Sequence, residues 1–148
     1  MRRISLLLPL GLILALLSAS TAFAQMNVRL RVITAGNDGK AAVDPSLRDL
    51  HRQLGSLFNF TSYRLIREEH LSLYPSLPTA IQAHPGRFIE VTLVRQYREG
   101  AEVKVRVIRE GRDILNTMVR LSPGRTVLIG GPRHGNRVII FALSDARH

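Results

Sequence analysis

Hydrophobic and polar residues alternate strictly along two stretches of the chain, as they do where successive side chains of a β-strand point to opposite faces. These stretches are Val28-Arg29-Leu30-Arg31-Val32 and Val103-Lys104-Val105-Arg106-Val107. Runs of apolar and β-branched residues predict further strands at 62–67, 88–97, 114–121, 126–129 and 138–143. The pattern therefore predicts about seven strands.

Short turn signals separate the last five of these strands. Arg98-Glu99-Gly100, Glu110-Gly111-Arg112 and Ser122-Pro123-Gly124 each place a glycine where the chain must reverse. Connections of two to five residues are typical of antiparallel hairpins, so we expect these strands to form a meander. Gly130 to Arg137 is the expected last hairpin loop.

A longer stretch, Tyr74 to Gly86, contains three prolines and is expected to be a loop of about 13 residues without regular structure. Loops of this length often bind a ligand or a partner, and Tyr74, Leu77 and Ile81 would be its apolar contacts. The alternative is a rigid crossover that packs against the core.

One segment has the pattern of an amphipathic helix. Asp44 is placed to cap its free amide groups, and Pro45 suits the first turn because an N–H there would have no partner. Apolar residues follow at helical spacing and form one stripe, which consists of Leu47, Leu50, Leu54, Leu57 and Phe58. Asn59 is the expected end of the helix.

A sheet with one apolar face needs a second layer to cover that face. We therefore expect an α+β fold in which one helix packs on a twisted antiparallel β-sheet of about seven strands. The alternative is a small β-sandwich or a partly closed barrel, because a second sheet, or curling of the same sheet, would also cover the face.

The first 24 residues have the three parts of a cleavable secretory signal peptide. Arg2 and Arg3 give the positive start, Leu6 to Leu17 is the apolar run, and Ala22-Phe23-Ala24 is the small-x-small pattern that signal peptidase accepts. The apolar run has about a dozen residues, whereas a membrane anchor needs roughly 20. No later apolar stretch is long enough to span a membrane. We expect cleavage after Ala24 and export of residues 25–148, as one globular domain, to the periplasm or the outside of the cell.

The expected mature domain is basic and has no cysteine. Two of the 21 basic residues and none of the 11 acidic residues lie in residues 1–24, so residues 25–148 carry a formal net charge of +8. Such a charge favours anionic partners. Because an exported protein seldom meets nucleic acid, we expect an anionic lipid, an acidic glycan or an envelope protein instead. The absence of cysteine excludes disulfides, thiol catalysis and cysteine-rich zinc sites.

Motifs that carry catalytic chemistry are absent from the sequence. No two of the five histidines are spaced three to five residues apart, as a zinc pair on a helix or hairpin requires. No serine lies in a Gly-x-Ser-x-Gly pattern, and no P-loop lysine follows the glycines. We therefore expect a protein that is not an enzyme and that holds neither a metal ion nor a cofactor.

Two groups of residues are candidate anion-binding sites. In the first, Gly130 and Gly131 would let backbone amides approach a phosphate or sulfate, with Arg133 and Arg137 completing the cradle beside His134. An ordinary solvated hairpin loop is the alternative for this segment.

The second group is a basic strand face. Arg29 and Arg31 lie on the outer side of one expected strand, and Lys104 and Arg106 lie on the outer side of another. If the two strands are neighbours, four cations share one face that would hold the protein to an anionic surface. An ordinary polar sheet face is the alternative.

The segment Thr126-Val127-Leu128-Ile129-Gly130-Gly131 resembles the short strand ending in paired glycines in the channel-forming part of bacterial secretins. The resemblance covers these six residues, and the chain lacks the length and the long membrane-spanning strands of that family. It implies a small companion of envelope secretion or pilus machinery. No functional residue is carried over from it.

The leading interpretation is a non-enzymatic protein of the bacterial envelope that works as a protein-interaction or assembly module. An unpaired edge strand accepts a partner strand through main-chain hydrogen bonds, and Val28 to Ile33 is the expected edge. The alternative is a binder of anionic lipids or glycans that uses the Gly/Arg loop and the basic face. Binding through charge should weaken with ionic strength, whereas pairing of apolar strands should not.

Overall fold

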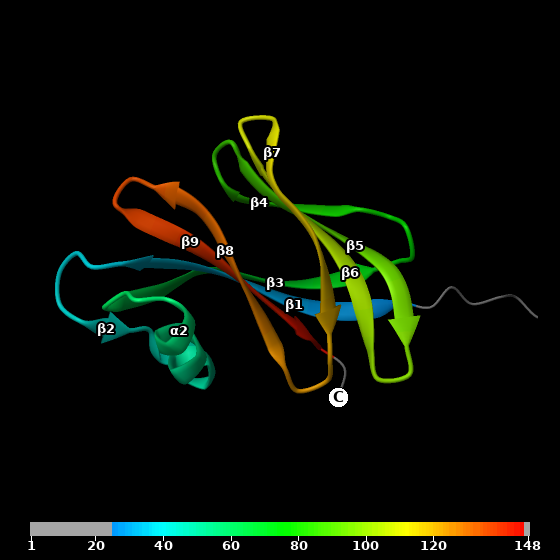
Figure 1. Ribbon diagram of the computed structural model, residues 1–148, viewed down its shortest axis with the longest axis horizontal. Helices are drawn as coiled ribbons and strands as arrows, with labels where there is room; N and C mark the ends of the chain where they lie inside the picture. Colours follow the sequence, from blue (N-terminus) through cyan, green and yellow to red (C-terminus); the bar gives the residue numbers. More distant parts are fainter. Residues whose placement is uncertain (1–24, 147–148) are drawn as a thin grey trace, which may run out of the picture.

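The computed structural model describes residues 25–146, which form two β-sheets and one short helical segment (Figure 1). The expected signal peptide, residues 1–24, lies outside the described residues, so export stays a prediction. Within the described part, no helix is both long enough and apolar enough to cross a membrane. The fold is mostly β, with a single helical region.

The first sheet contains both ends of the described chain. Its five strands lie in the order β2, β3, β1, β9 and β8. Their bounds are Met26–Gly36 for β1, Ala42–Val43 for β2, Ser62–Leu73 for β3, Thr126–His134 for β8 and Arg137–Asp145 for β9. β2 runs parallel to β3, and the other neighbours are antiparallel. β1 is therefore the middle strand.

The second sheet is an antiparallel meander of four consecutive strands, in the order β4, β5, β6 and β7. Their bounds are Thr79–His84 for β4, Arg87–Tyr97 for β5, Gly100–Arg109 for β6 and Arg112–Leu121 for β7. Gly100 and Gly111 have φ values of 119° and 76°, which suit the tight turns on either side of β6. The turn signals in the sequence predicted these two hairpins correctly.

The two sheets face each other across the main hydrophobic core. Alternate residues of β1, among them Val28 and Leu30, pack in one cluster with alternate residues of β6, among them Val103 and Val105. All four side chains are fully buried. The alternation in the sequence thus has a physical cause, because each strand buries one of its faces between the sheets.

The helical segment covers the opposite face of the first sheet. It consists of a 3₁₀ helix, η1 (Pro45–Leu50), followed by helix α2 (His51–Leu57). The Asp44 carboxylate accepts a hydrogen bond from the Ser46 amide at 3.0 Å, which confirms the expected N-terminal cap. A second hydrophobic core joins the helix to the sheet. Its fully buried residues are Ile33, Ala35, Leu47, Leu54 and Ile140.

The expectation of one sheet of about seven strands is wrong, because the strands belong to two open sheets and neither sheet closes into a barrel. That expectation assumed that each strand pairs with the next strand in the sequence. The chain instead leaves the first sheet after β3, builds the second sheet, and returns to the first sheet at β8. Two sheets around a shared core are the arrangement of the β-sandwich alternative.

Two segments that were expected to be loops contain strand residues. Within Tyr74 to Gly86, residues Thr79–His84 form β4. Within Gly130 to Arg137, strand β8 continues to His134, so that the loop is much shorter than expected. Prolines misled the first prediction, because they lie beside β4 rather than within it. Glycines misled the second prediction, because Gly130 and Gly131 continue β8.

Val28 to Ile33 is not an edge strand, because β1 pairs with β3 along one side and with β9 along the other. The basic residues in this stretch misled the prediction. Arg31 is covered by the helix rather than by solvent, so the strand is central although one of its faces carries charge.

Candidate functional site

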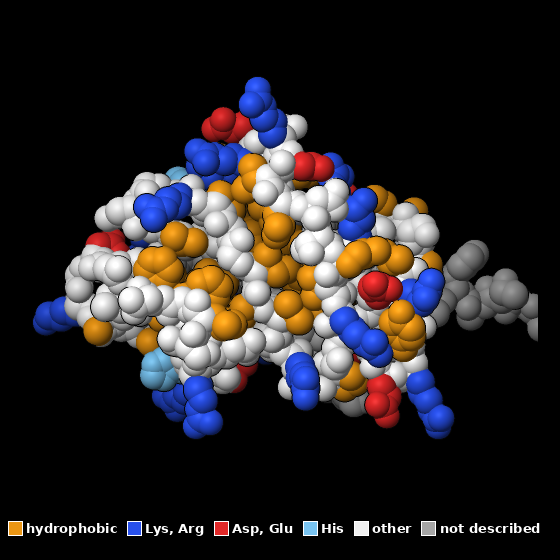
Figure 2. All heavy atoms as spheres, viewed as in Figure 1, with side chains coloured by type: hydrophobic (Ala, Val, Ile, Leu, Met, Phe, Trp, Pro, Cys, Tyr) orange, Lys and Arg blue, Asp and Glu red, His pale blue; other side chains and the backbone are white. Residues whose placement is uncertain are grey.

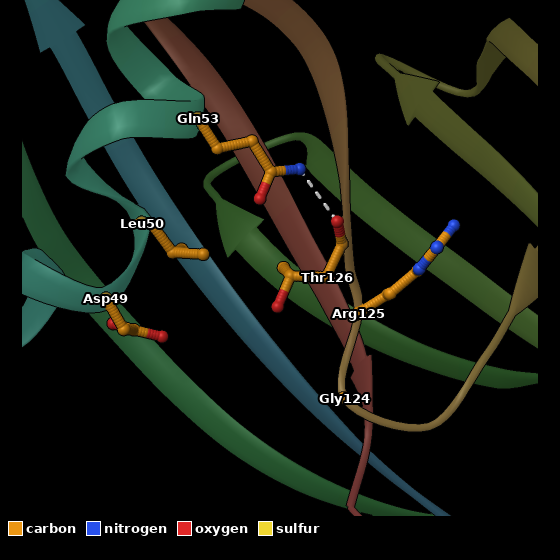
Figure 3. A pocket seen from close by; sticks show the side chains of 6 residues that line it. All are labelled: Asp49, Leu50, Gln53, Gly124, Arg125 and Thr126. Atoms are coloured by element: carbon orange, nitrogen blue, oxygen red, sulfur yellow. Dashed lines mark hydrogen bonds between the residues drawn. The ribbon is translucent and has the colours of Figure 1, made fainter.

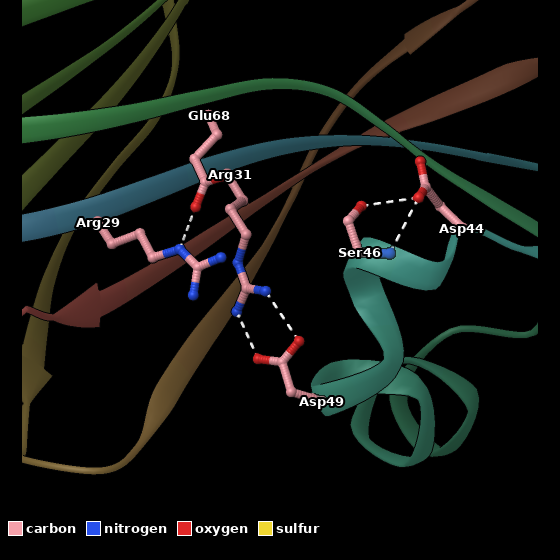
Figure 4. Close-up of polar contacts among 6 residues, drawn as sticks. All are labelled: Arg29, Arg31, Asp44, Ser46, Asp49 and Glu68. Atoms are coloured by element: carbon pink, nitrogen blue, oxygen red, sulfur yellow. Dashed lines mark hydrogen bonds and ion pairs between the residues drawn. The ribbon is translucent and has the colours of Figure 1, made fainter.

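Arg29 and Arg31 extend from β1 toward polar partners on neighbouring elements (Figure 4). Arg31 is 1% exposed, and its two terminal nitrogens donate hydrogen bonds to the two carboxylate oxygens of Asp49 in η1, at 2.9 and 3.0 Å. These bonds are the main reason why the pKa of Asp49 lies below its ordinary value. Arg29 pairs with Glu68 of β3. Both arginines therefore tie elements of the protein together.

Lys104 and Arg106 lie on the outer face of the second sheet, because the intervening residues of β6 are buried between the sheets. Arg106 donates hydrogen bonds to Glu90 of β5 at 2.9 Å and to Asp113 of β7 at 2.7 Å. These bonds raise the pKa of Arg106 and lower that of Asp113. The expected common face of four cations does not exist, because β1 and β6 lie in different sheets and direct their cations to opposite sides of the core.

Gly130 and Gly131 lie within β8 rather than in a loop, which corrects the geometry of the expected cradle. A Cβ atom on Gly131 would lie 2.8 Å from Phe141 Cε2 and 2.9 Å from the Ile139 carbonyl oxygen. A Cβ atom on Gly130 would lie 3.4 Å from Phe58 Cε1, which is an ordinary contact. Gly131 is therefore required for the close packing of β8 on β9, and its role is explained without a ligand.

The charged residues of the same segment have separate surroundings. Arg137 donates hydrogen bonds to Asp38 at 2.5 Å and to the Thr34 carbonyl at 3.2 Å, and so joins β9 to the end of β1 and the turn that follows it. Arg133 is exposed, and within residues 25–146 no carboxylate forms a salt bridge with it. A binding role for this segment stays a prediction. Of its two arginines, Arg133 is the one that is exposed to a ligand, because Arg137 is bonded to Asp38 and Thr34.

His134 lies against His84, with the ring centroids 3.8 Å apart. Because His84 ends β4, this contact joins the two sheets. Desolvation is the main cause that lowers the pKa of His134, and His84 and Arg87 lower it further. The lowered pKa favours a neutral ring at pH 7, where His134 does not repel its neighbour.

A hollow of about 450 Å³ lies between the helical segment and the start of β8 (Figure 3). Its lining residues are Asp49, Leu50, Gln53, Gly124, Arg125 and Thr126. The Gln53 amide donates a hydrogen bond to the Thr126 carbonyl at 2.8 Å, and the Arg125 side chain points away from the helix. Asp49 is already paired with Arg31, so the lining brings no free acid and base together. Over residues 25–146, no three His, Asp or Glu side chains form a cluster that would hold a metal ion.

The gap between β7 and β8 has the character of a binding surface. The two strands follow each other in the sequence, but they belong to different sheets and diverge from the turn that joins them (Figure 1). Neither is hydrogen-bonded to the other, so each has a free edge here. Apolar side chains gather in the middle of this face (Figure 2). The partly buried side chains of β7 and β8 that pack against the main core are Leu115, Val119 and Val127, and Ile129 is buried in the core beside them; these four residues define the β7–β8 gap below.

Exposed arginines lie near the ends of both strands that flank the β7–β8 gap. Arg112 and Arg120 are in β7, Arg125 directly precedes β8, and Arg133 is near the end of β8. In the described part of the chain, none of the four forms a salt bridge with a carboxylate. Arg120 instead lies over the Tyr97 ring, 4.8 Å from its centroid. The β7–β8 gap therefore combines apolar side chains at its centre with exposed arginines at its ends, which form no salt bridge within residues 25–146.

Sequence reasoning missed this surface because it treated β7 as an inner strand of one continuous meander. One signal pointed to it. Ile114 to Val119 has six residues without a charge or a proline, between Asp113 and Arg120. Such a segment is adhesive when its edge is free.

No model of a known protein family matches this chain, and a search of curated proteins finds no significant match. The function is therefore inferred from the residues and their geometry.

Proposed function

We propose that this chain is an exported, non-enzymatic protein of the bacterial envelope that works as a protein-interaction or assembly module. It receives an extended segment of another envelope protein in the β7–β8 gap. The observation that carries the proposal is the pair of unpaired strand edges beside a strip of apolar side chains. An added strand would satisfy free N–H and C=O groups, and its side chains would cover the strip.

Export is supported by the amino-acid pattern of residues 1–24. When the whole gene is expressed in a bacterium with a general secretory pathway, we expect the envelope fraction to contain a chain that begins at Gln25. Mass spectrometry of the intact protein measures this. An Ala24→Arg variant should accumulate as the precursor, because signal peptidase requires a small residue there. An unprocessed wild-type chain in the cytosol would contradict the proposed export.

The binding role is tested by site-specific photo-crosslinking in the native envelope. Met118 in β7 is 51% exposed and Leu57 in the helix is 61% exposed, so the control position is at least as open to a passing protein as position 118. We expect a discrete adduct from a crosslinker at position 118 and none from one at position 57. The adduct should persist in roughly 1 M salt, where the Debye length is about 3 Å. The same adducts from both positions would contradict a specific site.

A second candidate function is binding of anionic lipids or glycans, and the exposed arginines at the gap, which form no salt bridge within residues 25–146, favour it. The same experiment separates the two functions. An attachment that depends on charge alone disappears at high salt, whereas strand pairing with an apolar core does not. Loss of the position-118 adduct in high salt would therefore favour the lipid or glycan function.

A further inference from the structure

Four strands in the described sheets have a free edge along all or most of their length, namely β3, β4, β7 and β8. In β3 this edge is the part of the strand beyond its short pairing with β2. A free edge is adhesive, and proteins protect such edges with charges, prolines, bulges or a covering element. The four edges therefore differ in how open they are to a partner strand, and the most open edge is the candidate docking site.

The edges of β3 and β4 are protected. Asp44 Oδ2 accepts a hydrogen bond from the Leu65 amide of β3 at 3.2 Å, and four charged residues lie close to Leu65 in the strand. Arg64 directly precedes Leu65, and Arg67, Glu68 and Glu69 follow it. The Arg67 guanidinium in turn donates to the Gln82 carbonyl of β4 at 2.6 Å. β3 and β4 thus protect each other.

The edge of β8 is protected at both ends. The Gln53 side chain covers the first carbonyl of the strand, that of Thr126, with a hydrogen bond of 2.8 Å. Toward the other end, Pro132 has no N–H to offer, and the pairing with β9 is irregular between Gly130 and Arg133. Only a short central part of β8 is open to a partner.

The edge of β7 has one of these protections, a bulge at Ile114, where the pairing with β6 shifts between Leu115 and Asp113. The strand itself contains no proline. No hydrogen bond from another element reaches its free side among the contacts of residues 25–146. Its central residues, Ile114 to Val119, include no charge and no proline. Ile114 is 46% exposed and Met118 is 51% exposed, while Leu115 and Val119 contact the main core from the other face of the strand. Beyond the bulge, β7 therefore presents five consecutive residues, Leu115 to Val119, to a new neighbour.

We propose that β7 is the docking edge and that its occupant is an extended segment of an acidic partner protein, which adds a fifth strand to the second sheet. Alternate side chains of the segment are apolar and cover the partly buried Val127 in the β7–β8 gap. Carboxylates near its ends meet Arg112 and Arg120, which lack carboxylate partners in the described part of the chain. This inference rests on the proposed function and names the edge and the chemistry of its ligand.

Charge argues against a second copy of this chain as the occupant. Each copy carries a formal net charge of +8 after residue 24, so two copies repel. The antiparallel register that would pair exposed Ile114 with Met118 of the other copy also places Arg112 opposite Arg120. Like charges directly opposite each other destabilise a strand pair. An acidic segment relieves both problems.

The test measures binding of two synthetic peptides to the protein purified from the envelope fraction. Both have alternating valine and threonine in the centre; one has glutamates at its ends and the other has lysines. We expect the glutamate peptide to bind, and hydrogen exchange to slow in β7 rather than in β8. An Arg112→Glu, Arg120→Glu variant should bind it at least about fivefold more weakly, because two attractions become repulsions. The matched control is Arg48→Glu, Arg52→Glu, which changes the net charge equally but on the helical segment.

Each outcome decides a different point. Equal weakening by the two variants, or equal binding of the lysine peptide, would overturn the acidic ligand. Slower hydrogen exchange in β8 instead of β7 would overturn the assigned edge. A dimer in sedimentation that is joined through β7 would overturn the assigned occupant. Failure of both peptides would overturn this inference, whereas the proposed function would still stand if the crosslink at position 118 forms in the envelope.

Discussion

Replacing Asp49 with asparagine is expected to lower the free energy of unfolding by about 2–3 kcal/mol, as measured by urea denaturation at pH 7. Arg31 is 1% exposed, and Asp49 is the carboxylate that forms a salt bridge with it. Asparagine keeps the shape of the side chain but leaves the buried guanidinium without a counter-charge. The expected loss lies below that of a fully buried pair, because the Asp49 side chain is itself 55% exposed.

Two control variants separate this effect from ordinary loss of charge. Glu68→Gln breaks the neighbouring pair with Arg29, whose side chains are both about one-third exposed, and should cost less than about 1 kcal/mol. Arg31→Met combined with Asp49→Asn should recover most of the loss, because no charge is then buried. Equal losses for D49N and E68Q would show that the Arg31–Asp49 pair does not hold the helical segment on the sheet.

The same pair predicts a dependence of stability on pH. The pKa of Asp49 is lowered in the folded protein, so its contribution is fully present above the unfolded value of about 3.9 and is lost as the pH falls through the folded value. The stability curves of the wild type and D49N should therefore run apart at neutral pH and converge below about pH 4. A difference that persists unchanged in stronger acid would rule out this linkage.

The second large effect is expected at Gly131, where alanine should lower the free energy of unfolding by about 2–3 kcal/mol. The new Cβ atom would overlap the Phe141 ring and the Ile139 carbonyl, at 2.8 and 2.9 Å. The Ile139 oxygen is a backbone atom in the ladder of β9, so it cannot move aside without disturbing that ladder. Thermal and urea denaturation measure the loss.

The neighbouring Gly130→Ala is the matched control. Its Cβ atom would approach only the edge of the Phe58 ring, at 3.4 Å, and should change stability by less than about 1 kcal/mol. The anion-cradle interpretation makes a different prediction, because it needs both glycines for close approach of a ligand. If G130A folds normally but loses binding to heparin or inorganic phosphate, the cradle interpretation would regain support.

Local features of the fold followed directly from the residues. The Asp44-Pro45 start of the helical segment, the glycine turns around β6 and the alternating strands β1 and β6 were all predicted, because each depends on a few consecutive residues. The division into two sheets was not predictable in this way. It depends on which strands meet across the core, and strands of both sheets have the same alternating pattern.

The candidate site was predicted less well, for a related reason. Arg31 and Arg106 look alike in the sequence, because each lies between two apolar residues of an alternating strand. Arg31 lies between a leucine and a valine, and Arg106 lies between two valines. Their carboxylate partners come from other elements, Asp49 from the helical segment and Glu90 from β5. Sequence alone therefore located the cations but did not show which were neutralised. The open edge of β7 became apparent only when the order of strands was known.

The central position of β1 has a consequence for synthesis of the protein. Leu30 and Leu143 stand opposite each other although they come from the two extremes of the described chain. The middle of the first sheet cannot close until the ribosome or a translocation channel has released the last strand, and pairings between such distant residues form slowly. β8 joins that sheet through β9 alone. In a polypeptide that stopped short of Arg137, β1 would therefore pair with β3 only, and β8 would have no neighbouring strand in the sheet. The first sheet can therefore form completely only after β9 has been synthesised.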